Sequence, residues 1–297
     1  MQLTFDAPGI ASTMPPLAKA HTIIKWAGGK RWVMPHIVPG IYRRLARTGG
    51  RYVEPFLGGA AVALELGQPK MVLGDLCEPL IAMYRAVQRD PAAVAWALSA
   101  LATKGVDEAT YYEVRDSRPV APVLAAARFI YLNKLCFNGL YRENKSGGFN
   151  VPYGDAGTGD KSREEIAAIF PSEDRLVAAS EAFRGVKLVP ADFRAVLGLA
   201  REGDLVFCDP PYADTFSAYT SAGFSAGDQA DLSEHLCKLA GAGAHIVSTN
   251  NDTPLIRDLY KWATVLPTAE LRAINSDGDG RGRSGCLIIT SDQDLLG

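Results

Sequence analysis

Residues 206–212 read Val206-Phe207-Cys208-Asp209-Pro210-Pro211-Tyr212. A short apolar run followed by Asp-Pro-Pro-Tyr predicts a buried strand whose pairing ends at the two prolines, because proline has no backbone N–H to donate. Asp209, the Pro210 carbonyl and the Tyr212 ring would then surround a small pocket at the carboxyl end of a strand, where open α/β sheets bind ligands. Two acceptors beside an aromatic face suit a flat heterocycle with an exocyclic amino group. The simpler alternative is a strand end and a proline turn, with Tyr212 as ordinary packing.

A second strand end lies upstream, in the stretch Tyr52-Val53-Glu54-Pro55-Phe56-Leu57-Gly58-Gly59-Ala60-Ala61-Val62. The pattern predicts a strand, a glycine turn and the start of a helix, and the small residues let a ligand approach the backbone. A GxGxxG fingerprint is absent, so NAD is not indicated. Residues 71–75 predict the next strand. Asp75 at its end lies roughly 20 residues after the turn opens, a spacing at which an acidic group can hold ribose hydroxyls.

The segment Lys25-Trp26-Ala27-Gly28-Gly29-Lys30-Arg31 invites comparison with a phosphate-binding loop. The upstream glycine spacing is missing and Arg31 stands where such loops have Ser or Thr, so an NTPase is rejected. Two interpretations remain open. The segment is either a tight glycine turn that sets Trp26 and Lys30 around a ligand, or a turn with two surface cations and a packing tryptophan.

Strands and helices alternate again in the last third of the chain. Val186–Val189 predicts a strand followed by Asp192 and Phe193, an acid and an aromatic at another strand end. The loop 275–285 is glycine-rich, and its Arg281 and Arg283 could clamp phosphates, although a merely mobile hairpin loop is the alternative. The other strands expected are 205–208, 245–249, 271–274 and 287–290, with helices at 226–240 and 254–260.

From about Arg85 to Gly185 the pattern is helical, except for Asn138–Tyr153, where two half-apolar runs around Lys-Ser-Gly-Gly predict a β-hairpin. The hairpin mixes Asn, Arg, Lys and Tyr, which are side chains used to contact base edges and phosphates. A solvated hairpin without a ligand is the alternative. The expected helices run from Pro91 to Lys104, from Val123 to Leu135, from a capping box at Ser162 and Glu165, and from Ser172 to near Gly185.

The bulk composition is that of a globular protein with a sizeable core: 297 residues, 47% hydrophobic and 22% charged. The formal net charge of -2 gives no support for nucleic-acid binding, so any such surface must come from local clustering. The five cysteines form no CxxC pair and the four histidines are isolated, so neither a disulfide framework nor a metal site is expected. Without a signal peptide or a membrane-length apolar run, the expected location is the cytoplasm.

The order of these motifs closely resembles that of the DNA adenine-N6 methyltransferases, in the group that includes the GATC-methylating enzymes. The resemblance spans roughly Ile23 to Thr290, and several motifs agree both in their residues and in their order along the chain. The motifs are Lys25-Trp26-Ala27-Gly28-Gly29-Lys30, Glu54-Pro55-Phe56-Leu57-Gly58-Gly59, Asp75, Leu132-Asn133-Lys134, Asn138-Gly139-Leu140-Tyr141-Arg142, Phe149-Asn150-Val151-Pro152-Tyr153-Gly154 and Asp209-Pro210-Pro211-Tyr212.

The resemblance implies an α/β fold: a Rossmann-like, seven-stranded methyltransferase sheet with an inserted helical and β-hairpin target-recognition domain. Residues 1–20 would be a flexible N-terminal arm, residues 21–84 and 186–297 the catalytic domain, and residues 85–185 the target-recognition domain, with its hairpin at about 138–153. The implied methyl donor is S-adenosylmethionine. By motif position, the residues that contact the donor or line its pocket are Trp26, Lys30, Glu54, Phe56, Gly58, Asp75, Asp192, Phe193 and Asp209.

The implied chemistry agrees with the pocket inferred from Asp-Pro-Pro-Tyr. An adenine amino nitrogen is a poor nucleophile, and hydrogen bonds from it to Asp209 and the Pro210 carbonyl would make its lone pair available. The base must first leave the duplex, and Tyr212 would stack against it. Methyl transfer is then direct, without a metal, a covalent enzyme intermediate or a nucleophilic cysteine. The catalytic residues are therefore expected to be Asp209, Pro210, Pro211 and Tyr212.

Double-stranded DNA is the implied partner, and whether a cognate restriction enzyme accompanies the protein is left open. The hairpin has Glu143, Lys145 and Ser146 where GATC enzymes carry an aromatic residue and an arginine, so GATC is not indicated as the target. Gly285-Cys286 stands where the family often has an acidic residue. The candidate DNA contacts are Lys25, Asn138, Arg142, Asn144, Lys145, Arg281 and Arg283.

Two kinds of rival remain. One keeps the fold and changes the acceptor to cytosine N4, an RNA adenine or a protein glutamine amide, all of which present an NH₂ group. The inserted hairpin favours duplex DNA as the substrate, and the residues Asp-Pro-Pro-Tyr favour adenine over cytosine as the acceptor base. The other rival is a non-catalytic DNA-binding module that has kept the fold.

Overall fold

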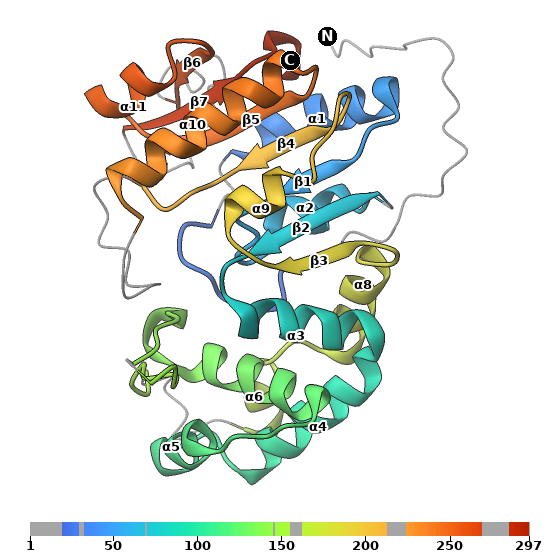
Figure 1. The fold of residues 1–297 in the computed structure, drawn as a ribbon. Helices are drawn as coiled ribbons and strands as arrows, with labels where there is room; N and C mark the ends of the chain where they lie inside the picture. Colours follow the sequence, from blue (N-terminus) through green and yellow to red (C-terminus); the bar gives the residue numbers. More distant parts are fainter. Residues whose placement is uncertain are drawn as a thin grey trace, which may run out of the picture.

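The computed structural model describes residues 20–29, 33–68, 70–144, 146–154, 162–212, 224–268 and 285–296. Within these residues seven strands form one sheet in the order β3-β2-β1-β4-β5-β7-β6, which confirms the expected α/β class (Figure 1). The strands are β1 (Tyr52–Glu54), β2 (Met71–Asp75), β3 (Lys187–Pro190), β4 (Leu205–Cys208), β5 (His245–Asn251), β6 (Thr264–Pro267) and β7 (Cys286–Thr290).

Strand direction decides where the candidate residues meet. The pairs β3–β2, β2–β1, β1–β4 and β4–β5 are parallel, whereas β7 is antiparallel to both β5 and β6. Glu54 is the last residue of β1, Asp75 the last of β2, and Asp209 follows β4 directly. Because these three strands are neighbours and run the same way, the three carboxylates come to one edge of the sheet.

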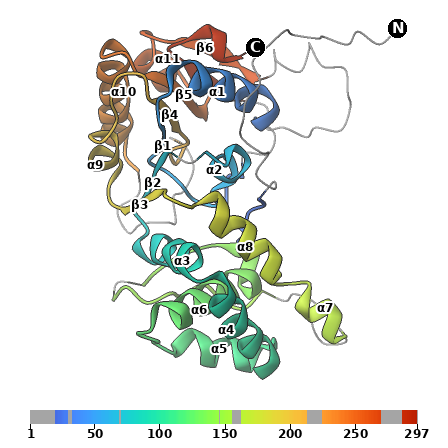
Figure 2. The same ribbon diagram turned by 90° about the vertical axis from the view of Figure 1, so that its right-hand side faces the viewer.

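Helices cover both faces of the sheet, because alternate strand residues point to opposite sides. In β4, Phe207 belongs to one buried core and Val206 to the other. Figure 2 shows α9 and α10 on one side of the sheet and α1 and α2 on the other. These helices are α1 (Met34–Thr48), α2 (Ala61–Leu66), α9 (Phe193–Leu197) and α10 (Ala226–Gly241), with α11 (Pro254–Leu259) packed beside α10.

The middle of the chain forms a separate group of helices below the sheet in Figure 1, where α6 packs against α3 and α4. The predicted ends of α4 are confirmed: the Asp90 side chain accepts from the Ala93 N–H, and Gly105 follows the last turn. The predicted capping box of Ser162 and Glu165 is also present. The group consists of α3 (Glu78–Arg89), α4 (Pro91–Lys104), α5 (Glu108–Asp116), α6 (Pro122–Leu135), η1 (Phe137–Gly139), α7 (Arg163–Ala167) and α8 (Glu173–Ala182).

The predicted hairpin is present in a reduced form. Antiparallel bridges join Cys136 to Tyr153 and Glu143 to Phe149, but neither side extends into a regular strand. The turn between them is closed by the Asn144 N–H, which donates to the Gly148 carbonyl at 2.8 Å. The chain therefore reverses direction where the sequence predicted.

The C-terminal strands differ partly from expectation. β7 confirms the strand predicted at 287–290, and it pairs with β6, which the sequence analysis did not identify. The strand expected at 271–274 and the loop 275–284 lie outside the described residues, as does the N-terminal arm up to residue 19. A short helix, η2 (Gln293–Leu296), ends the described chain. No helix within the described residues is long and apolar enough to span a membrane.

Candidate active site

The edge of the sheet where β1, β2 and β4 end is acidic and desolvated. Glu54 is only 3% exposed, and the Tyr52 hydroxyl donates to its Oε2 at 3.0 Å. Burial raises the pKa of Glu54 well above its ordinary value, and the negative charges of Asp209 and Asp75 raise it further. Burial also raises the pKa of Asp75. Three carboxyl groups gathered in this way favour a cationic ligand.

The glycine turn after β1 is held by side chains from two other elements. The Gly58 N–H donates to Asp75 Oδ2 at 2.9 Å, and the Tyr84 hydroxyl donates to the Gly58 carbonyl at 3.0 Å. Gly58 has a φ of +47°, and a Cβ on it would lie 2.7 Å from Cδ1 of Trp26. Only glycine lets the indole lie this close to the turn. The structure thus brings together three of the predicted donor residues: Trp26, Gly58 and Asp75.

Asp75 has a structural task as well as the expected ligand-binding one. Its Oδ1 accepts from the Cys77 N–H and its Oδ2 from the Gly58 N–H, both at 2.9 Å. These two hydrogen bonds partly offset the effect of burial on its pKa. Asp75 therefore shapes the glycine turn from the end of the neighbouring strand.

An aromatic group lies at the ends of β1 and β3. The Phe56 and Phe193 rings stack with centroids 5.5 Å apart, and the Phe224 ring lies 5.7 Å from Phe56 and 5.6 Å from Phe193. Phe56 and Phe193 were predicted to belong to one site, and the structure places them together. Phe224 was not predicted, because it lies more than 160 residues after Phe56 and nothing local marks it.

Asp192 caps α9 and ties it to α10 through Arg194. The Asp192 Oδ1 accepts from the Arg194 N–H at 2.9 Å, and the Arg194 guanidinium also pairs with Asp228 at 2.8 Å and Asp231 at 2.5 Å. The guanidinium beside it lowers the pKa of Asp228 to about 2. This network fixes Phe193 within the aromatic group.

The Asp-Pro-Pro-Tyr stretch is bound to β5, α10 and β7. Asp209 Oδ1 accepts from the Thr249 hydroxyl at 2.7 Å, and the Pro211 carbonyl accepts from Gln229 Nε2 at 2.9 Å. The Tyr212 hydroxyl hydrogen-bonds with the side chains of Thr249 and Cys286. Burial, followed by the charge of Asp209, raises the Tyr212 pKa. Cys286 therefore lies next to the Asp-Pro-Pro-Tyr stretch.

A buried amide joins the sheet edge to the helical group. Asn133 of α6 is 3% exposed. Its Nδ2 donates to the Lys25 carbonyl at 2.7 Å and to the Gly139 carbonyl at 3.3 Å, and its Oδ1 accepts from the Lys25 N–H at 2.8 Å. Trp26 continues the connection by stacking on Tyr141, with ring centroids 5.9 Å apart. Asn133 was part of a recognised motif but was not predicted as a site residue, and a polar amide in an apolar helix was its one signal.

The described DNA candidates lie on exposed surface. Lys25, Asn138, Arg142 and Asn144 are all exposed. The Arg142 Nε donates across the hairpin to Asn150 Oδ1 at 2.7 Å. Asn144 Oδ1 accepts from the backbone N–H groups of the turn, so its side chain stabilises the hairpin. Four other predicted site residues lie outside the described part of the chain: Lys30, Lys145, Arg281 and Arg283.

A cation that the sequence analysis missed lies near Lys25. Lys134 of α6 is half-buried, and burial followed by the charges of Arg175 and Lys25 lowers its pKa to about 8. The lowered pKa shows that Lys134 lies close enough to Arg175 and Lys25 to feel their positive charges.

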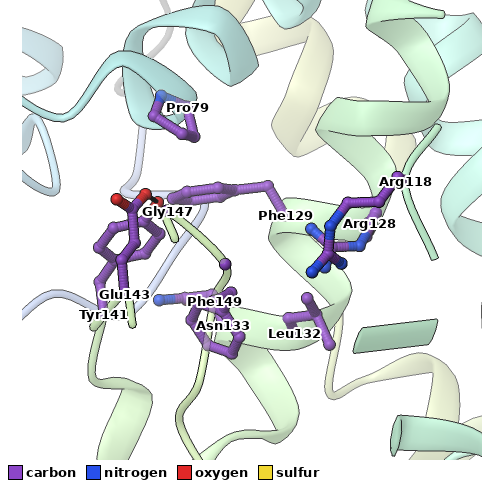
Figure 3. Close-up of a pocket in the computed structure, with 11 residues that line it drawn as sticks. Pro79, Arg118, Arg128, Phe129, Leu132, Asn133, Tyr141, Glu143, Gly147 and Phe149 are labelled. Atoms are coloured by element: carbon purple, nitrogen blue, oxygen red, sulfur yellow. Dashed lines mark hydrogen bonds between the residues drawn. The ribbon is translucent and has the colours of Figure 1, made fainter. Parts of the chain in front are cut away.

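A cavity of about 100 Å³ lies under the hairpin and apart from the sheet edge (Figure 3). Arg118 and Arg128 lie at one end, and Tyr141 with Glu143 at the other. The Arg128 Nε donates to the Val114 carbonyl at 3.0 Å and Arg118 Nη1 to the Ser117 carbonyl at 2.8 Å. None of the predicted donor residues lines this cavity, so it belongs to the packing of the hairpin on α6. Among the described residues no group of three or more His, Cys, Asp or Glu could hold a metal ion.

Comparison with known proteins assigns this arrangement to a family. Residues 26–274 match the family described as D12 class N6 adenine-specific DNA methyltransferase. The chain is 34% identical to the retron Ec67 DNA adenine methylase of Escherichia coli, with 90% of each protein covered. It is 33% identical to the type II methyltransferase M.MjaIII of Methanocaldococcus jannaschii (87% and 94% covered) and 31% identical to the DNA adenine methylase of Serratia marcescens (92% and 98% covered). The chain therefore belongs to the D12 class of N6 adenine-specific DNA methyltransferases.

Proposed function

We propose that this enzyme transfers a methyl group from S-adenosylmethionine to the N6 amino group of an adenine flipped out of duplex DNA, at a specific target sequence. The observation that carries the proposal is the position of Asp209. It follows β4 directly, beside the buried Glu54 and Asp75, and its carboxylate is held by Thr249. An acceptor for an amino group therefore adjoins an acidic, desolvated edge suited to a cation.

The residues at this edge fit the donor. When bound, S-adenosylmethionine supplies a methyl group on a positively charged sulfur. Glu54 and Asp75 would face the positively charged sulfonium and amino group of the donor, and these cations would stabilise the ionised carboxylates against the effect of burial. Phe56 and Phe193 offer an aromatic surface for the donor adenine, and the indole of Trp26 lies over the glycine turn. Lys30 remains a proposed contact by motif position.

The acceptor is activated by hydrogen bonding. Asp209 and the Pro210 carbonyl would each accept one hydrogen from the adenine amino group, which draws the nitrogen toward a pyramidal geometry with an available lone pair. Tyr212 would stack on the flipped base. Held in this way, the nitrogen would be aligned to take the methyl group from the donor sulfur, and Asp209 would accept the proton that the alkylated nitrogen loses. Alignment supplies most of the rate enhancement.

The helical group would recognise the target. The division into a catalytic domain of residues 21–84 and 186–297 and a target-recognition domain of residues 85–185 is kept as a proposal, with the first boundary falling inside α3. The proposed DNA contacts are Lys25, Asn138, Arg142, Asn144, Lys145, Arg281 and Arg283. The enzyme would act in the cytoplasm, with or without a cognate restriction enzyme.

The Asp209→Ala variant tests this assignment. Removal of the carboxylate should lower the rate of methyl transfer to unmethylated duplex DNA by at least about 100-fold, because the amino group loses an acceptor that acts at the reacting nitrogen. The thermal unfolding midpoint should stay close to that of the wild type. Asp258→Ala, at an exposed position of α11, is the matched control and should keep full activity. Near-normal turnover in Asp209→Ala would contradict the mechanism.

A further inference from the structure

Three successive residues of β5 have polar side chains in the interior of the sheet. Ser248, Thr249 and Asn250 are each fully buried. Buried polar side chains destabilise a protein unless they are hydrogen-bonded, and a strand at this depth is usually apolar. Each of the three binds to a different part of the Cys208–Tyr212 stretch, directly or through one further side chain. The run therefore has a task other than packing.

Thr249 controls the catalytic carboxylate. Its hydroxyl donates to Asp209 Oδ1 at 2.7 Å and also hydrogen-bonds with the Tyr212 hydroxyl. One short side chain thus fixes the rotation of the Asp209 carboxylate and the position of the Tyr212 ring. Both groups must face the same base, so a common anchor keeps them in register.

Asn250 controls the proline carbonyls through an oriented relay. The Asn251 N–H donates to Asn250 Oδ1 at 2.9 Å, which fixes the Asn250 amide. Asn250 Nδ2 then donates to Gln229 Oε1 at 3.0 Å, and Gln229 Nε2 donates to the Pro211 carbonyl at 2.9 Å. Each amide has one orientation that satisfies its neighbour, so the direction of the Pro211 carbonyl is set by a backbone N–H of β5.

Ser248 holds the base of the loop. Its hydroxyl donates to the Cys208 carbonyl at 3.0 Å, at the last residue of β4. The proline rings fix the φ angles of Pro210 and Pro211, so few torsions remain free between Cys208 and Tyr212. Anchors at the start, the carboxylate and the second carbonyl therefore restrain the Pro210 carbonyl that would accept from the adenine.

We infer that Ser248, Thr249 and Asn250, with Gln229 of α10, are positioning residues that set the geometry of the Asp-Pro-Pro-Tyr acceptors for methyl transfer. This β5 frame touches neither substrate and acts through Asp209 and the proline carbonyls. The inference rests on the proposed function and extends it to four residues in a strand and a helix that no sequence motif marked.

The test compares variants that remove one hydrogen bond and keep the side-chain shape. Thr249→Val and Gln229→Met should each lower the single-turnover rate on unmethylated duplex DNA by about 10- to 100-fold, because misplacement of reacting groups by about 1 Å has effects of this size. The Kd for DNA should stay within about twofold, since the hydrogen bonds of the frame end on the Asp-Pro-Pro-Tyr stretch. Thr249→Ser keeps the hydroxyl and should therefore keep most of the wild-type single-turnover rate.

Thr290→Val is the matched control. Thr290 of β7 is also a fully buried strand threonine, and its hydroxyl donates to the Ile246 carbonyl at 2.9 Å, away from the catalytic loop. This variant should lose stability to a similar extent and keep its single-turnover rate per folded molecule. If Thr249→Val and Gln229→Met also keep the wild-type single-turnover rate, the frame does not position the loop. The same conclusion follows if Thr249→Ser is folded and yet inactive.

The activity of the wild type distinguishes failure of the proposed function from failure of the inference about the β5 frame. If the wild type methylates RNA or protein and leaves DNA unmodified, the proposed function fails, and the same rate ratios measured on that acceptor still decide the inference. A wild type that transfers no methyl group to any of these acceptors would overturn both.

Discussion

Glu54 is the residue at which burial and charge act together most plainly in the site. Burial of its carboxyl raises its pKa well above the ordinary value, and the negative charges of Asp209 and Asp75 raise it further, whereas the hydrogen bond from Tyr52 partly offsets the increase. A cation bound beside it stabilises the ionised form and lowers that pKa. In the proposed site, binding of the sulfonium would therefore release protons, and by linkage its affinity would rise with pH.

This linkage predicts different pH dependences for two ligands. Above the ordinary pKa of glutamate the affinity for S-adenosylmethionine should increase with pH, whereas that for S-adenosylhomocysteine, which lacks the sulfonium charge, should change less. Glu54→Gln should remove the difference. Calorimetric titration of each ligand at several pH values measures how its affinity depends on pH. Equal slopes for the two ligands, or a slope retained in Glu54→Gln, would contradict the role of Glu54.

The same raised pKa has a consequence for stability. The folded state binds the Glu54 proton more tightly than the unfolded state, so the ionised form destabilises the fold above the ordinary pKa of glutamate. Glu54→Gln should therefore increase the free energy of unfolding more at about pH 8 than at about pH 5. This pH dependence of stability is an internal control for the binding experiment.

Single residues differ in how far the sequence reveals them. Asp209 and Asp75 were predictable because a carboxylate that ends an apolar strand is a local signal. Gln229 and Phe224 were not, since each acquires its role by meeting Pro211 or Phe56, distant in the chain. A buried partner of this kind is visible only after the strands have been ordered.

Among the elements, the glycine turn after β1 depends on both backbone conformation and space. Gly58 has a positive φ, and a Cβ there would collide with the indole of Trp26. Gly49, at the end of α1, also has a positive φ, of +66°, but open space around it. Substitutions at Gly49 and Gly58 therefore separate the effect of backbone conformation from the effect of the collision with Trp26.

Gly49→Ala should lower the free energy of unfolding by about 1–2 kcal/mol, the usual cost of the left-handed conformation for a residue with a Cβ. Gly58→Ala should lose more, and it should also weaken S-adenosylmethionine binding at least about tenfold because Trp26 must move. Chemical denaturation and calorimetry measure both. If Gly58→Ala binds the donor as tightly as Gly49→Ala does, Trp26 and the turn do not form part of the donor site.

Elements with local end signals were predicted well, and others were not. The ends of α4 follow from Asp90-Pro91 and Lys104-Gly105. By contrast α1 contains Pro39 and Gly40, both unfavourable inside a helix. A Cβ on Gly40 would lie 1.8 Å from the Leu295 carbonyl oxygen, so packing against the C-terminal segment requires the glycine. Tertiary contacts override the local preference in this helix, and the short edge strand β6 lacks the alternating pattern that marks a strand.

At the scale of the whole molecule, the fold places the proposed donor site at an edge of the sheet that carries three carboxyl groups, next to the proposed DNA contacts. The net charge of -2 is compatible with DNA binding because charges of opposite sign are separated. Glu54, Asp75 and Asp209 lie at the sheet edge, whereas Lys134 belongs to α6 of the helical group, with Lys25 near it. Asn133 and the stack of Trp26 on Tyr141 connect the two regions.

The identity of the methylated nucleoside tests the central claim most directly. Purified protein is incubated with methyl-labelled S-adenosylmethionine and unmethylated duplex DNA, and the DNA is digested to nucleosides and analysed. We expect the label in N6-methyldeoxyadenosine, and none with Asp209→Ala. Label in N4-methylcytosine, or label in RNA or protein while several unmethylated genomic DNAs remain unlabelled, would contradict the assignment.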